Sequence, residues 1–108
     1  MDIQFEETPG ALVVTPRLKR LDAVAAVEFR TVVAPRVQNA RVVVLSLADV
    51  AFMDSSGLAA LISVLKRLPA GGQLRLAAPS SSVRSLLSIT RMDKVFSIHD
   101  SLADALRG

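Results

Sequence analysis

The chain has 108 residues, of which 51% are hydrophobic and 21% charged, so we expect one folded domain and not a disordered segment. It has no cysteine and a single histidine, His99, which excludes disulfides, thiolate metal sites, a cysteine nucleophile and multi-histidine metal sites. The formal net charge is only +3, and tryptophan and tyrosine are absent, so the composition gives no sign of nucleic-acid binding.

The sequence indicates neither a membrane segment nor a secretory signal. No apolar run approaches the roughly 20 residues of a membrane span. Acidic Asp2, Glu6 and Glu7 stand where a secretory signal has a basic region and an apolar block. We therefore expect a cytoplasmic protein that binds no membrane, no nucleic acid, no metal and no cofactor.

Strand and helix patterns alternate along the chain. The Thr8-Pro9-Gly10 turn joins the first two strands, Asp22 is typical of a helix N-cap, and Pro35 breaks the helix that follows. The predicted elements are strands at 3–7 and 11–15, a basic connection at 17–21, a helix opening at Asp22, a strand at 41–47, a helix at 55–68, a strand at 73–77, a helix introduced by 79–82, a strand at 95–98 and a helix capped by 100–101. This order predicts a single α/β domain over residues 1–108, in which about four helices pack on a mixed sheet of four to five strands opened by a hairpin.

Residues 52–58, Phe52-Met53-Asp54-Ser55-Ser56-Gly57-Leu58, carry most of the functional information. An apolar strand leads to them, and an amphipathic helix begins at them, with apolar residues at the i, i+3, i+4, i+7 spacing of one buried stripe. Asp54, Ser55 and Ser56 therefore lie where the first backbone N–H groups of a helix have no internal partner. Such a junction suits an anion, including a phosphoryl group placed on a serine.

Two arrangements of this helix start are open. If Asp54 is the N-cap, its carboxylate accepts hydrogen bonds from the N–H groups of Ser56 or Gly57, and the Ser55 hydroxyl stays free. If Ser55 is the cap, its hydroxyl is tied to the backbone. We predict the first arrangement, and we expect Gly57 to leave room for the backbone of another protein.

The chain resembles STAS domains of the bacterial anti-sigma-factor antagonist type over nearly its whole length. The residues that carry this resemblance are Leu21-Asp22, the segment Asp54-Ser55-Ser56-Gly57-Leu58 after Phe52-Met53, Gly71-Gly72 before Leu74 and Leu76, and Asp93-Lys94-Val95-Phe96. In this family the first serine of the segment is phosphorylated by a partner that is both a serine protein kinase and an anti-sigma factor. The unmodified antagonist binds that partner and frees the sigma factor, and a separate serine phosphatase restores the antagonist. The resemblance thus implies that Ser55 is the phosphoacceptor.

Further residues are expected to contribute to this site. Asp22 should lie at the same edge of the sheet as Ser55, and Lys19 and Arg20 should flank a docking surface and attract an acidic partner. Capping alone also explains Asp22, and solvent exposure alone explains the two loop cations, so both interpretations stay open. The residues expected to support the phosphosite and contact the partner are Asp54, Ser56, Gly57, Leu58, Asp22, Lys19 and Arg20.

Lys19 and Arg91 stand where members of this family often have glycine, which bears on partner identity more than on mechanism. The alternative to a switch is a constitutive STAS scaffolding module, in a stressosome-like assembly or beside a transporter. We expect no enzyme, because His99 and Asp100 lack the Gly-x-Ser-x-Gly elbow that a serine hydrolase of that type requires.

Overall fold

The computed structural model describes all 108 residues, and its main sheet has five strands in the order β1-β2-β4-β6-β7. The first two strands form an antiparallel hairpin, and every later neighbour pairs in parallel. The predicted mixed sheet opened by a hairpin is thus confirmed. The strands are β1 (Ile3–Thr8), β2 (Ala11–Pro16), β4 (Val42–Ser46), β6 (Gln73–Ala77) and β7 (Ser97–His99).

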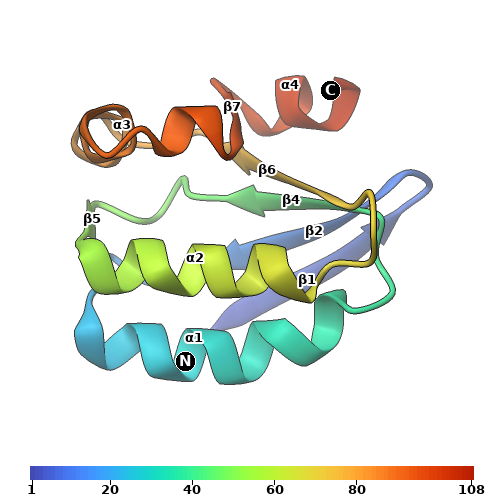
Figure 1. The fold of residues 1–108 in the computed structure, drawn as a ribbon, viewed down its shortest axis with the longest axis horizontal. Helices are drawn as coiled ribbons and strands as arrows, with labels where there is room; N and C mark the ends of the chain where they lie inside the picture. Colours follow the sequence, from blue (N-terminus) through green and yellow to red (C-terminus); the bar gives the residue numbers. More distant parts are fainter.

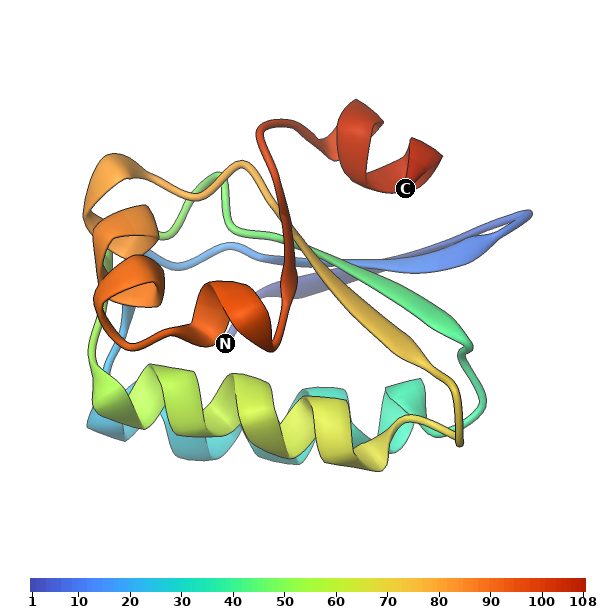
Figure 2. The same ribbon diagram turned by 45° about the horizontal axis from the view of Figure 1, so that its top comes forward.

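Four α-helices pack around this sheet, as the alternating pattern predicts. α1 and α2 lie side by side and run in the same direction (Figure 1), whereas α4 lies on the opposite face of the sheet from them (Figure 2). The α-helices are α1 (Ala23–Val33), α2 (Ser55–Arg67), α3 (Ser81–Ile89) and α4 (Leu102–Arg107), and two 3-10 helices are η1 (Ala34–Val37) and η2 (Met92–Lys94).

The central strands are buried on both faces, as parallel strands covered by helices require. Val14 and Leu45 belong to a core cluster of 21 buried residues that includes α1 and α2 side chains such as Phe29 and Leu61. Strand residues whose side chains point to the other face of the sheet form a second, smaller cluster with α4. This cluster contains Val13, Val44, Ala77 and Ala105. β2 and β4 run in parallel, and α1 and α2 follow them in the chain, so both helices begin at the carboxyl edge of the sheet.

The structure differs from the sequence prediction at the basic connection. Residues 17–21 contain a two-residue strand, β3 (Arg20–Leu21), which pairs in parallel with β5 (Phe52–Met53) in a separate two-stranded sheet. This sheet is too short to leave a periodic signal, because two residues cannot show the alternation that identifies a strand.

The last strand also begins later than the predicted residues 95–98. The backbone N–H groups of Val95 and Phe96 both donate to the carbonyl of Met92, at 3.0 and 2.8 Å. These donors are used in a tight turn and cannot join the sheet ladder, so β7 spans Ser97–His99.

Candidate functional site

The two-stranded sheet brings the starts of α1 and α2 together. Arg20 pairs with Phe52 and Leu21 pairs with Met53, so the next residue on each strand, Asp22 or Asp54, follows at an equivalent position. Each of these aspartates is the N-cap of the helix that follows it. Both helices begin at the same end of the fold (Figure 1), as predicted for Asp22 and Ser55.

Asp54 closes the first turn of α2. Its Oδ1 accepts hydrogen bonds from the backbone N–H groups of Ser56, at 2.9 Å, and Gly57, at 3.2 Å. Ser55 is therefore the first helical residue, its side chain is exposed, and its hydroxyl makes no hydrogen bond within the chain. This is the predicted arrangement, and it leaves the hydroxyl accessible to a modifying enzyme.

Gly57 and Leu58 pack in the interior of the fold and are not available to a partner. Both are buried, and a Cβ placed on Gly57 would lie 2.5 Å from the carbonyl oxygen of Leu21. The expectation that Gly57 leaves room for another protein's backbone is therefore wrong, because this chain's own backbone fills that space. Leu58 packs in the main core, so neither residue offers a contact surface.

Asp22 is held by its own helix and by a neighbouring arginine. Its Oδ1 accepts from the backbone N–H of Ala25 at 3.2 Å, and Oδ2 lies 3.6 Å from Nε of Arg20. The Ala25 hydrogen bond is the main cause that holds the pKa of Asp22 below its ordinary value; desolvation opposes this shift, and the smaller effect of the Arg20 charge adds to it. Asp22 is thus an anion already engaged in capping.

Arg20 and Lys19 play different parts. The Arg20 guanidinium lies over the Phe52 ring, 4.2 Å from its centroid, in addition to its contact with Asp22. Lys19 contributes its carbonyl oxygen, which accepts from the N–H groups of Ala51 at 2.8 Å and Phe52 at 3.0 Å, while its side chain is exposed and forms no ion pair. Of these two cations, Lys19 is therefore the one whose charge has no partner within the chain.

One exposed residue of this region was missed from the sequence. Val24, in the first turn of α1, is 86% exposed and adjoins Asp22. Together with Arg20 it lines a shallow groove of about 400 Å³ between α1, the first two residues of the chain and the connection that follows β2. The signal is visible in hindsight, because Val24 falls outside the apolar stripe of its helix. We call Lys19, Arg20, Asp22, Val24 and Ser55 the switch surface, after the role that we propose for these residues.

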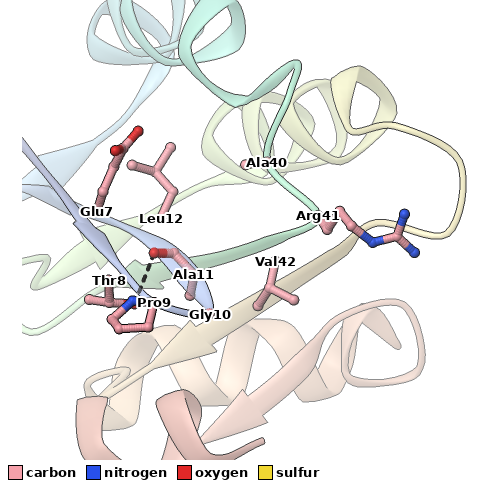
Figure 3. A pocket seen from close by; sticks show the side chains of 9 residues that line it. All are labelled: Glu7, Thr8, Pro9, Gly10, Ala11, Leu12, Ala40, Arg41 and Val42. Atoms are coloured by element: carbon pink, nitrogen blue, oxygen red, sulfur yellow. Dashed lines mark hydrogen bonds between the residues drawn. The ribbon is translucent and has the colours of Figure 1, made fainter.

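A second hollow lies at the other end of the sheet and offers no comparable chemistry. It has a volume of about 320 Å³ and lies between the β1–β2 turn and the start of β4. Thr8 Oγ1 donates to the carbonyl of Ala11 at 2.9 Å, and the Arg41 guanidinium points away from the other lining residues (Figure 3). No polar groups converge there on a common point.

The serine, histidine and aspartate near the C-terminus do not form a triad. The Ser97 hydroxyl lies 2.5 Å from Nε2 of His99, but the Asp100 carboxylate pairs with Arg84 at 2.7 Å. No cluster of three or more potential metal-ligating side chains occurs in the structure. None of its helices is long and apolar enough to cross a lipid bilayer.

The comparisons with known proteins agree with this architecture. A Thermotoga neapolitana protein named as the homologue of a "putative anti-sigma factor antagonist" is 35% identical over 65 residues, and the match covers 59% of this chain and 58% of that relative. The crystal structure of the Thermotoga maritima protein with that description has a TM-score of 0.89 at 25% identity, over 97% of this chain and 92% of that one. The crystal structure of an anti-sigma factor antagonist from Mycobacterium paratuberculosis has a TM-score of 0.87 at 25% identity, over 98% and 91% of the two chains.

The curated relative is matched over less than two thirds of its length. The family match covers far more, because the STAS domain model aligns with residues 2–105. This span contains every element from β1 to α3, both N-capping aspartates and Ser55. The chain therefore belongs to the STAS domain family.

Proposed function

We propose that this chain is an anti-sigma factor antagonist in a partner-switching circuit, with Ser55 as its phosphoacceptor. The unphosphorylated form binds an anti-sigma factor that is also a serine protein kinase, phosphorylation of Ser55 releases that partner, and a serine phosphatase restores the antagonist. The observation that carries this proposal is the free, exposed hydroxyl of Ser55. It exists because Asp54 takes the capping role that Ser55 would otherwise fill.

A phosphate on Ser55 would change the switch surface more than the fold. It brings about −1.5 to −2 charges and three acceptor oxygens. Two unit charges about 4 Å apart repel by about 4 kcal/mol at an effective dielectric of about 20, before solvent screening, so neighbouring Asp54 opposes the dianion. The helix N-terminus offsets roughly 0.3–1 kcal/mol of this repulsion when the group is exposed.

The same phosphate is much more unfavourable inside a closed protein–protein interface than on the free surface. A partner that covers Ser55 would remove water from the phosphate, and an unpaired buried dianion is strongly disfavoured. A loss of about 3 kcal/mol weakens binding more than a hundredfold. The switch therefore works by surface charge and bulk, with little rearrangement of the backbone.

The rest of the switch surface has the mixed character of a docking site. Val24 supplies exposed apolar area, and Lys19 supplies a cation with no internal partner. Arg20 and Asp22 largely neutralise each other. The net effect favours a partner that meets Val24 with apolar side chains and Lys19 with acidic ones.

The test is phosphorylation by the host's serine kinases of the anti-sigma factor type, with ATP, followed by mass spectrometry. We expect one added phosphate that is lost in Ser55→Ala and retained in Ser81→Ala. Ser81 is a matched control, because it is also exposed at the first position of a helix and follows a capping residue, Ser80. Absence of phosphate on Ser55 with every such kinase, or kinase affinity unchanged by phosphorylation, would refute the switch and favour a constitutive scaffold.

A further inference from the structure

A basic groove lies between the C-terminal halves of α1 and α2, which run side by side (Figure 1). Its volume is about 360 Å³, and only one of its lining residues is hydrophobic. The residues that line this basic groove are Arg30, Thr31, Ala34, Ser63, Lys66 and Arg67.

The three cations of the basic groove have no acidic partner. The ion pairs of the structure engage Arg17, Arg20, Arg84 and Arg107, and none involves a groove residue. The nearest acid in sequence, Glu28, binds the Met1 amino group at 2.8 Å. No acidic residue occurs between positions 28 and 49 or between 54 and 93. The positive charge of the groove is therefore uncompensated.

Helix stability explains only part of this arrangement. Cations in the last turn of a helix interact favourably with its dipole, which accounts for Arg30, Lys66 and Arg67 taken singly. Their gathering in one groove adds mutual repulsion, which a bound anion would relieve. We propose that the basic groove binds an acidic segment of a partner protein through its aspartate and glutamate side chains.

The polar groups of the groove suit a peptide. The Thr31 hydroxyl donates to the carbonyl of Val27 at 2.9 Å and keeps its lone pairs free, and the Ser63 hydroxyl makes no hydrogen bond. These oxygens accept hydrogen bonds from peptide N–H groups, while the arginine guanidinium groups match carboxylates in a bidentate geometry.

A nucleic acid would need a longer basic surface. Several other arginines are already occupied: Arg17, Arg20, Arg84 and Arg107 by carboxylates, and Arg36 by the Phe5 ring at 4.0 Å. The free cations therefore do not form the extended stripe that a phosphate backbone follows. A short acidic peptide segment therefore matches the small basic groove better than a nucleic acid does.

Binding in the basic groove should not depend on Ser55. α2 has 13 residues between Ser55 and Arg67, and a rise of about 1.5 Å per residue places these ends roughly 18 Å apart. This exceeds the Debye length of about 8–10 Å at physiological salt. A partner held here would stay bound while the switch surface is phosphorylated.

The experiment measures binding of a fluorescein-labelled peptide with alternating glutamate and serine by fluorescence anisotropy. We expect the combined variant Arg30→Gln, Lys66→Gln and Arg67→Gln to weaken binding at least tenfold. The matched control removes three other exposed cations without ion pairs, through Arg41→Gln, Arg91→Gln and Lys94→Gln, and should stay within about twofold of wild type. Ser55→Asp should also stay within about twofold.

Three results would overturn the proposal. The first is no measurable binding of the peptide by the wild-type chain, and the second is an equal loss in the groove variant and the control. The third is tighter binding of a DNA duplex than of the peptide, lost in the same groove variant. Thermal unfolding of each variant by circular dichroism establishes that the comparison is made between folded proteins. Because Ser55 is not needed for peptide binding, failure here leaves the phosphorylation switch standing.

Discussion

Gly57, in the first turn of α2, packs directly against the backbone of Leu21, the last residue of β3. A Cβ at Gly57 would lie 2.5 Å from the Leu21 carbonyl oxygen and 2.6 Å from Cγ of Met53. The glycine therefore allows the helix that carries Ser55 to approach the strand that directly precedes Asp22. This contact holds the two halves of the switch surface together.

Replacement of Gly57 by alanine should strain this contact. We expect Gly57→Ala to lower the free energy of unfolding by about 1–3 kcal/mol, as overpacking of a tight core position does, despite the better helix propensity of alanine. Urea denaturation followed by circular dichroism measures the change. Gly10→Ala is the control, because nothing lies within 4 Å of its Cβ position. Equal stability of Gly57→Ala and Gly10→Ala would show that α2 shifts away from Leu21 without cost.

Local features of the site could be predicted from the sequence, whereas contacts between distant residues could not. Helix caps are local, so Asp22 and Asp54 were identifiable from the aspartate and the apolar spacing after it. The role of Gly57 depends on Leu21, a residue 36 positions earlier, and no local pattern reports such a contact. The same holds for the pairing of β3 with β5, which has only two residues on each side. The fold class and the two N-caps were therefore accessible, whereas the close packing that joins the two helix starts was not.

Loss of the Asp54 cap should be measurable on its own. Asp54→Ala removes the acceptor for the N–H groups of Ser56 and Gly57, and we expect a loss of about 1 kcal/mol of stability, within the range of about 0.5–2 kcal/mol for such caps. Asp54→Asn keeps the acceptor and should retain most of the stability in urea denaturation. Asp49→Ala is a matched control, since Asp49 makes only an exposed contact with Arg17 and should cost less than about 1 kcal/mol. A loss in Asp54→Ala no larger than in Asp49→Ala would argue that the cap contributes nothing.

Asp22 should make stability depend on pH in the acidic range. The folded state lowers the pKa of this carboxyl below its ordinary value of 3.8, chiefly through the Ala25 hydrogen bond, so the folded state favours the ionised form. Its contribution is therefore complete above the unfolded pKa and is lost as the pH falls through the lower, folded pKa. We expect the stability difference between the wild type and Asp22→Asn to shrink as the pH is lowered through this window. A difference that stays constant from neutral pH to below the folded pKa would contradict the assignment.

Arg91 should be replaceable by glycine with a gain in stability. It follows the C-cap of α3 with a φ of 64°, in the left-handed region that costs an L-residue roughly 1–2 kcal/mol. Part of that gain is offset by the greater backbone freedom of an unfolded glycine, so we expect Arg91→Gly to add about 0.5–1 kcal/mol. Ser88→Gly, within the same helix, should lose about 0.5–1 kcal/mol instead. Thermal unfolding of the two variants distinguishes them, and destabilisation in both would mean that the Arg91 side chain contributes more than its strain costs. Lys19, the other departure from the family's glycines, has no positive φ and gives no reason to expect such a gain.

A phosphate on Ser55 should be repelled by the Asp54 carboxylate without unfolding the domain. Two unit charges about 4 Å apart repel by about 1 kcal/mol even in water, so phosphoserine at position 55 should destabilise the wild type by at least that much more than it destabilises Asp54→Asn. The measurement is a double-mutant cycle of urea denaturation on four proteins, with phosphoserine introduced during synthesis so that no kinase is needed. Added salt should reduce the coupling, because both groups are solvent-accessible. A coupling near zero at low salt would place the dianion away from Asp54. In the proposed switch, the phosphate would then have to repel the partner without help from Asp54, and Asp54 would serve only as a helix cap.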